Sequence, residues 1–204
     1  AEATAAELRA KGTTAVIAIG DVSEEAGAEA VVREAHRGLG RLDILVNNAG
    51  AGGRHLGAHA ENMSLDDWDI IVRTHLRSTF LCSKHTVPLM REGGFGRIVN
   101  TSSMNVTGGG RPGVTNYSAA KAGLLQFTRC LLTELRPHGV RVTSVLPSWG
   151  QTDFTNSADL PPREADILAK CISPEDLGRL LVQLAEMPSH LVTEELTLWP
   201  MVQP

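Results

Sequence analysis

Cysteines, long apolar runs and leader-like segments are scarce in this sequence, and their scarcity excludes several classes of protein. Its three cysteines, Cys82, Cys130 and Cys171, are too few and too scattered for a disulfide framework or a zinc site. They are expected to be buried thiols in a reducing compartment. No stretch approaches the roughly 18 uninterrupted apolar residues of a membrane span. The first residues form neither a basic leader nor an apolar signal segment. We therefore expect a cytoplasmic protein with no membrane partner.

An excess of basic residues is also missing. The 19 Lys and Arg against 23 Asp and Glu give a formal net charge of -4. Such a balance gives no sign of the basic surface that binds nucleic acid or an anionic membrane. The 42% of hydrophobic residues is ordinary for a globular protein, and 204 residues suffice for one core. We expect a single domain over 1–204.

What the sequence does contain is an alternation of helix-like and strand-like segments. This alternation is typical of βαβ units and predicts an α/β fold, with a doubly wound parallel sheet and helices on both faces. Helices are expected over about 1–12, 24–38, 65–90, 117–135 and from 174 onward, with Ser23, Ser64 and Ser173 as N-caps. Strands are expected over 13–19, 42–46, 97–101, 140–146 and 195–198.

The only tyrosine in the chain, Tyr117, stands four residues before Lys121 at the start of a predicted helix. At this spacing the two side chains share one helix face. The ammonium group can then approach the phenol and favour its ionised form. Such a tyrosine can exchange a proton with an alcohol or a ketone, so the pair predicts a general acid/base site.

Small and polar residues follow three consecutive predicted strands. The segments are Asn47–Gly50, Ser102-Ser103 and Pro147–Thr152. Parallel sheets present the carboxyl ends of their strands to ligands, so these segments are expected to line one cleft with the tyrosine.

With these motifs, the sequence resembles the short-chain dehydrogenase/reductase family over essentially the whole chain. Asp21-Val22, N-N-A-G, S-S, Y-S-A-A-K-A-G and P-x-x-x-x-T occur in the family's order and at about its spacings. The resemblance implies that Tyr117 is the general acid/base. It also implies that Lys121 lowers the pKa of Tyr117 and holds the nicotinamide ribose, and that Ser103 orients the substrate oxygen.

The resemblance further implies NAD or NADP as the cofactor, without distinguishing the two. Asp21 and Val22 would border the adenine, while Asn47, Asn48, Ala49 and Gly50 would line the cofactor cleft. Tyr117 and Lys121 would contact the ribose, Pro147 would lie over the nicotinamide, and Thr152 would reach its carboxamide.

The family's opening strand, its glycine-rich turn T-G-x-x-x-G-x-G and the strand that follows have no match in this sequence. We therefore expect a Rossmann-like domain whose N-terminal βαβ portion is missing, and in which the strand at 42–46 becomes an exposed apolar edge. Alternatively, the strand at 13–19 slides inward and pairs with it. The coding sequence upstream of Ala1 would show whether a glycine-rich turn precedes this segment.

Three further positions depart from the family pattern. His75 stands where most members have an asparagine that takes part in a water-mediated proton relay, which an imidazole could also bridge. Ser103 lies one residue further from Tyr117 than in most relatives, so Ser102 is kept as an alternative. Ser148 replaces the usual glycine after Pro147. No metal is expected, because His55 and His59 lack a third ligand.

The predicted function is an NAD(P)-dependent oxidoreductase that interconverts a secondary alcohol and a ketone. Its small-molecule substrate would contact the loops 51–63 and 148–172, which carry Arg54, Leu56, Trp149, Phe154 and Leu160. The resemblance implies a homodimer or homotetramer that pairs the helices 65–91 and 114–135. The alternative is a non-catalytic fragment or pseudoenzyme that keeps only this association surface.

Overall fold

The computed structural model describes residues 1–108, 111–152, 154 and 166–202. Its centre is a parallel sheet in the order β1-β2-β3-β4. The strands are β1 (Ile44–Asn47), β2 (Gly96–Thr101), β3 (Val140–Pro147) and β4 (Glu195–Leu198). The predicted parallel α/β architecture is confirmed.

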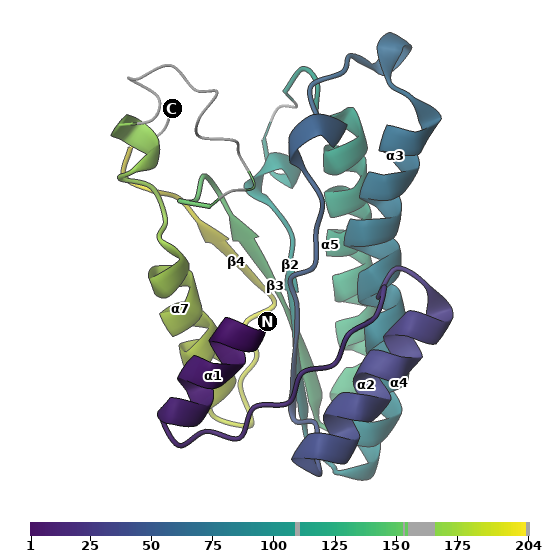
Figure 1. The fold of residues 1–204 in the computed structure, drawn as a ribbon, viewed down its shortest axis with the longest axis vertical. Coiled ribbons are helices and arrows are strands. Elements are labelled where there is room, and N and C mark those ends of the chain that lie inside the picture. The colour runs from purple at the N-terminus through teal and green to yellow at the C-terminus, as the bar shows by residue number, and fades with distance from the viewer. Residues whose placement is uncertain (109–110, 153, 155–165, 203–204) are drawn as a thin grey trace.

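Helices cover both faces of the sheet, as predicted. They are α1 (Glu2–Ala10), α2 (Glu25–Leu39), α3 (Leu65–Val72), α4 (Ser78–Glu92), α5 (Thr115–Leu135) and α7 (Pro174–Glu186). In Figure 1, α1 and α7 lie on one side of the sheet, and α2, α4 and α5 lie on the other. Short 3-10 turns cover Gly53–His55, Ala60–Asn62, Met104–Val106 and Arg136–His138.

The two central strands are apolar on both faces, which explains why both faces carry helices. Ile98, Val140 and Val142 pack with Met90 of α4 and with the end of α5. The alternate positions Val99 and Val145 pack with Leu184 of α7. Successive side chains of a strand point to opposite faces, so β2 and β3 divide the core into two layers.

The predicted strand at 13–19 is wrong. Residues 13–20 are not in a strand, and within the described chain residues 14–20 form no backbone hydrogen bond with one. The segment instead packs along α2, where Val16 lies so close to Gly38 that an added Cβ would be 2.5 Å from it. A β-branched run becomes a strand only where a neighbour can accept its backbone hydrogen bonds, and here helix packing prevails.

Strand β1 lies at one edge of the described sheet and pairs only with β2. Its side chains Ile44 and Val46 are 47% and 40% exposed. The expected apolar edge is therefore present, and the alternative in which 13–19 pairs with this strand is excluded in this structure.

Two of the three predicted helix caps are confirmed. The hydroxyls of Ser64 and Ser173 each accept a hydrogen bond from the backbone N–H three residues later, at the starts of α3 and α7. Ser23 is not a cap, because its hydroxyl donates to Asp21 Oδ1 at 2.7 Å and α2 begins after Glu24.

The helix predicted over 65–90 contains a π turn at Arg73–Arg77, between α3 and α4. Three side-chain hydroxyls around it donate hydrogen bonds to backbone carbonyls one turn earlier: Thr74 to Ile70 O, Ser78 to Thr74 O and Thr79 to His75 O. Ser and Thr hydroxyls that bond to the carbonyl four residues earlier often bend a helix, which agrees with an irregular turn at this place. Single π turns are frequent at functional sites, and this one is centred on the buried His75.

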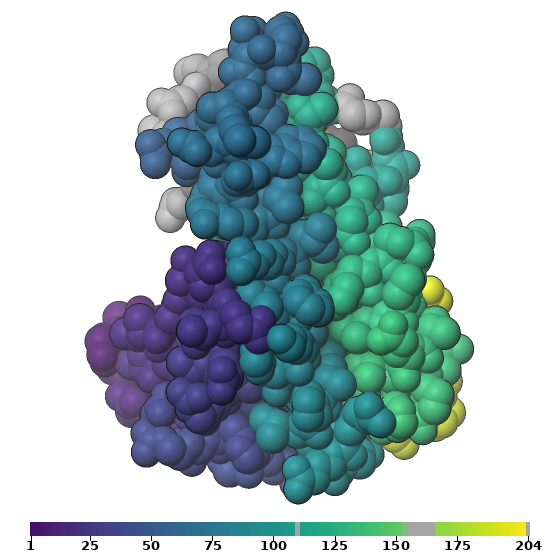
Figure 2. Space-filling model, turned by 90° about the vertical axis from the view of Figure 1, so that its right-hand side faces the viewer, coloured from purple at the N-terminus to yellow at the C-terminus, as the bar shows by residue number. Residues whose placement is uncertain are grey.

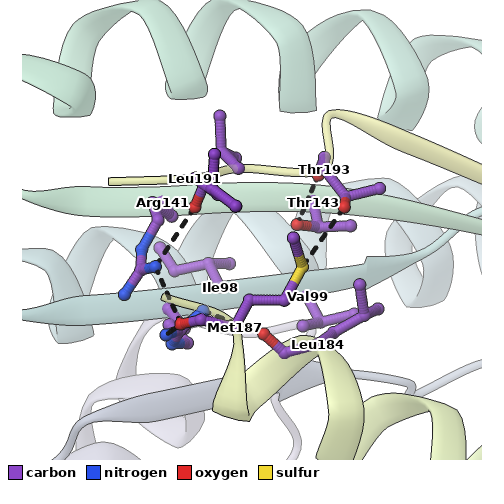
Figure 3. Close-up of a pocket in the computed structure, with 10 residues that line it drawn as sticks. Ile98, Val99, Arg141, Thr143, Leu184, Met187, Leu191 and Thr193 are labelled. Carbon is purple, nitrogen blue, oxygen red and sulfur yellow. Dashed lines mark hydrogen bonds between the residues drawn. The ribbon is translucent and has the colours of Figure 1, made fainter. Parts of the chain in front are cut away.

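Two buried arginines fasten α7 to the sheet at the end opposite the carboxyl ends of the strands. Arg97 of β2 and Arg141 of β3 are partners in register. Arg97 donates to Leu184 O at 2.8 Å. Arg141 donates to Pro188 O at 2.7 Å and, as Figure 3 shows, to the carbonyls of Met187 and Leu191. Cations favour the carbonyl-rich C-terminus of a helix, so the pair holds the end of α7 in place.

Candidate active site

A cavity of about 400 Å³ opens at the carboxyl ends of β1, β2 and β3. This is the edge at which doubly wound sheets bind ligands, and the volume is in the range of small-molecule sites. Residues after all three strands and the start of α5 form its wall. Among the predicted site residues, those that line it are Asn48, Gly50, His75, Ser103, Tyr117, Lys121, Pro147 and Thr152.

Lys121 is buried in the wall of this cavity, one helical turn after Tyr117. Its ammonium group donates a hydrogen bond to Thr101 O at the end of β2. Its Nζ lies 5.6 Å from the centre of the Tyr117 ring. Loss of hydration disfavours the charged form of a buried lysine, and it lowers the pKa of Lys121 from 10.5 to about 7. The lysine can therefore both hold and release a proton near neutral pH.

Tyr117 is enclosed by aromatic rings. The His75 ring meets it edge-on at 5.1 Å between centroids, and the Phe154 ring lies 5.6 Å away. Burial raises the pKa of Tyr117 above its ordinary value of 10, and a side-chain hydrogen bond with Ser103 partly offsets the rise. The expected lowering by Lys121 is not found here, because burial dominates and the lysine is directed to Thr101. At neutral pH, Tyr117 is a proton donor.

The two serines after β2 point in different directions. The Ser102 hydroxyl donates to Lys121 O at 3.1 Å and fixes α5 against the strand. Ser103 is the serine whose side chain lowers the pKa of Tyr117, and its hydroxyl accepts a hydrogen bond from Asn105 N at 3.3 Å. This geometry favours Ser103 over Ser102 as the partner of the tyrosine.

His75 lies behind the tyrosine in the π turn. Its Nε2 is 2.7 Å from Ala51 O, and its Nδ1 is buried with no hydrogen-bond partner among the described residues. Burial, followed by the nearby Lys121 charge, lowers the pKa of His75 from 6.5 to about 4. Its imidazole is therefore neutral at pH 7. An added Cβ on Gly50 would lie 2.5 Å from the ring, so only glycine allows this close packing.

Asn116, which the sequence analysis missed, fixes the start of α5. It is fully buried, and its amide nitrogen donates to His55 O and to Asp67 O, at 3.1 Å each. Its Oδ1 accepts the backbone N–H of Tyr117 at 2.8 Å. The His55 and Asp67 side chains are themselves paired at 2.7 Å. The loop before α3 and the N-terminus of α5 are thus joined through one amide, and no sequence motif marked it.

Asn47 belongs to a buried polar ladder and does not line the cavity. Its amide nitrogen donates to Asn100 Oδ1 at 2.9 Å, and Asn100 donates to Thr128 Oγ1 at 2.9 Å. The ladder joins β1, β2 and α5. Buried amides that are satisfied in this way hold neighbouring elements in one register.

Three other predicted cofactor residues also lie outside the cavity wall. Ala49 is exposed beside it. Asp21 is exposed and bonds to the backbone and hydroxyl of Ser23, which lowers its pKa. Val22 packs against Ala28 of α2 and Leu81 of α4.

The predicted substrate loops contribute Leu56, Trp149 and Phe154 to the wall. Arg54 is exposed and does not line it, and Leu160 lies outside the described residues. Arg111, which the sequence analysis did not single out, also lines the cavity. It follows a run of three glycines, and a basic residue in such a loop is by itself a weak signal.

The nicotinamide half of NAD or NADP fits the chemistry of this wall. The wall offers the ammonium group of Lys121, the amide of Asn48 and the hydroxyl of Thr152, and its described residues include no carboxylate. A mostly apolar cleft with these few polar groups and no acidic ones suits a nicotinamide ring, a ribose and a carboxamide.

No group of three His, Cys, Asp or Glu side chains able to hold a metal ion is present in the described ranges. His55 pairs with Asp67, and His59 Nδ1 lies 3.9 Å from Glu61. Within the same ranges, no helix is both long and apolar enough to cross a bilayer.

Comparison with known proteins gives a consistent result. The sequence profile of the short chain dehydrogenase family matches residues 1–162. A (2S)-[(R)-hydroxy(phenyl)methyl]succinyl-CoA dehydrogenase subunit of Thauera aromatica is 36% identical over 197 residues, which cover 94% of this chain and 77% of the relative. A 3-oxoacyl-[acyl-carrier-protein] reductase of Synechocystis is 35% identical over 93% of this chain and 75% of its own length.

Solved structures agree with the sequence relatives. A metagenomic short-chain oxidoreductase in complex with NADP superposes with a TM-score of 0.81 at 27% identity. The superposition covers 99% of this chain and 81% of that structure.

Proposed function

Because this chain belongs to the short-chain dehydrogenase/reductase family, whose members are NAD(P)-dependent oxidoreductases, we propose that it interconverts a secondary alcohol and a ketone. The proposal rests on one observation: Ser103, Tyr117 and Lys121 all line the same cavity at the carboxyl edge of the sheet. A relative named as a 3-oxoacyl-[acyl-carrier-protein] reductase and a short-chain oxidoreductase solved in complex with NADP support the same reaction class.

In the direction of reduction, Tyr117 gives its proton to the developing alkoxide. The raised pKa of the tyrosine keeps it protonated until negative charge appears on the substrate oxygen. The Ser103 hydroxyl, which bonds to the tyrosine, also contacts that oxygen and orients it. When bound, the nicotinamide cofactor supplies or accepts the hydride.

Lys121 restores the proton. With a pKa of about 7, its amine exchanges protons with solvent near neutral pH and favours re-protonation of the tyrosine. The neutral His75 lies close enough to Lys121 for the lysine charge to lower its pKa. Its Nδ1, which has no hydrogen-bond partner in the part of the chain that the structure describes, is suited to bridge a water in this relay. The ribose and carboxamide would contact Asn48, Gly50, Pro147, Thr152, Tyr117 and Lys121.

The decisive experiment is the Tyr117→Phe variant, assayed with NADH or NADPH and a 3-oxoacyl thioester. We expect kcat to fall by roughly 10²-fold or more, the size of a lost general acid. Quenching of cofactor fluorescence should persist, because the ring remains. A variant that keeps full turnover would exclude this mechanism. A wild-type chain that neither binds the cofactor nor turns over would favour the association-only alternative.

The outer face formed by α4 and α5 supports the pairing of subunits. In Figure 2 the blue-to-teal surface of α3 and α4 lies beside the green surface of α5 on this face. Phe80 of α4 is 46% exposed, yet its ring packs edge-on against Phe127 of α5 at 6.3 Å. Exposed aromatic pairs are typical of the centres of interfaces, so this face is the proposed contact of a homodimer or homotetramer.

The described strands form one sheet with helices packed on both faces, which supports the expectation of a single domain over 1–204.

A further inference from the structure

We propose that Arg111 and Trp149 form a subsite for a negatively charged group on the ketone substrate. The inference rests on the proposed function and adds a substrate class to it. The substrate would be a ketone whose carbon chain carries a carboxylate or a phosphate-bearing carrier at the end away from the reacting carbonyl.

Arg111 and Trp149 come from two different loops and meet at the cavity wall. Arg111 precedes α5, and Trp149 follows β3. The guanidinium carbon lies 4.7 Å from the centre of the Trp149 ring, and both residues line the cavity that holds Tyr117 and Ser103. A stacked guanidinium has its plane fixed by the ring, while the N–H groups on its edge remain free to bind a carboxylate or a phosphate.

The charges around the cavity favour an anion. None of its described lining residues is acidic, and no ion pair within the described ranges involves Arg111. The imidazole of His75 is neutral at pH 7, and Lys121 is bonded to Thr101 O. Arg111 is therefore the permanent positive charge of the described wall, and its exposed side chain lies where an anionic group of a substrate in the cavity can reach it.

The rest of the wall suits a carbon chain. Leu56, Met104 and Val114 line the cavity together with Arg111. An apolar wall with one fixed cation selects for an acyl chain that ends in an anionic group. A neutral ketone of the same length would lose only the charged contact.

The test compares two matched pairs of ketones with wild type and Arg111→Gln. Acetoacetyl-coenzyme A is paired with its uncharged N-acetylcysteamine thioester, and acetoacetate with its methyl ester. We expect the ratio of kcat/KM for the charged over the neutral member to fall about tenfold in Arg111→Gln, mostly through KM, as for the loss of one charge-assisted hydrogen bond. The pair that responds identifies a phosphate carrier or a carboxylate as the recognised group.

Two further variants complete the test. Arg111→Lys should recover part of the kcat/KM ratio, because it keeps the positive charge but loses the planar guanidinium that stacks on Trp149. Arg33→Gln removes the same charge from the exposed face of α2 and should leave both ratios unchanged. If wild type reduces all four ketones and neither ratio responds to Arg111→Gln, the subsite is excluded while the proposed function stands. If wild type binds NADH or NADPH but reduces none of them, the substrate class is excluded while the proposed function stands; if it also fails to bind the cofactor, both are excluded.

Discussion

At the residue scale, Lys121 links the chemistry of the site to the stability of the fold. Its pKa is about 7 in the folded chain and 10.5 as a free side chain. Between these values the unfolded state binds more protons, so stability must rise with pH. Below about pH 7 the lysine is charged in both the folded and the unfolded chain, so the full cost of burying its charge reduces the stability. We predict a slope of up to about 1.4 kcal/mol per pH unit between pH 7 and 10, which is absent in Lys121→Met.

Urea unfolding of the two proteins from pH 6 to pH 10 measures this difference directly. Other groups titrate in both proteins alike, so the difference between the two curves isolates the lysine. Parallel curves would show that folding does not lower the pKa of Lys121.

The residue scale also shows where sequence reasoning succeeds. Helical periodicity alone predicted that Tyr117 and Lys121 share a face, and both line the cavity. The direction of the Tyr117 pKa could not be predicted, because His75 and Phe154, which enclose the ring, lie 42 and 37 residues away in sequence.

At the scale of elements, the Asn116 amide is the joint between α5 and the loop that leads into α3. Asn116→Ala would leave the carbonyls of His55 and Asp67 and the N–H of Tyr117 without this partner. We predict a loss of about 1–3 kcal/mol in the free energy of unfolding, the usual cost of unsatisfied buried groups. We also predict a lower kcat, because the joint positions Tyr117.

Thermal or urea unfolding and steady-state kinetics check this prediction, with Asn62→Ala in the exposed turn at Ala60–Asn62 as the matched control. An Asn116→Ala protein that is as stable and as fast as wild type would contradict the role of the joint.

Local signals explain which elements were predictable. The caps of α3 and α7 are set by residues three positions apart, and the prediction was correct for both. The segment 13–19 has strand-like composition but pairs with no strand of the described chain, so tertiary context decided its conformation. At the π turn, three hydroxyls donate hydrogen bonds to carbonyls one turn earlier, and the hydrophobic periodicity of the sequence gives no sign of such bonds.

At the scale of the whole molecule, the face of α4 and α5 is expected to set the oligomeric state. We predict that Phe80→Asp shifts the sedimentation of the protein toward monomers, because a charge cannot be buried at the centre of an apolar contact without a partner. Val182→Asp on α7 is the matched control, since Val182 is also exposed, at 55%. Equal sedimentation of wild type and both variants would place the subunit contact elsewhere.

The position of β1 at the sheet edge determines the order in which the fold opens. Among the described residues no strand pairs with its outer edge, while β2 and β3 are paired on both sides. Amide hydrogen exchange should therefore be fast along β1 and slowest along the two inner strands. Because Ser103 and Trp149 follow those inner strands, fraying of the edge would leave both loops anchored, and these two side chains would be among the last to lose their arrangement.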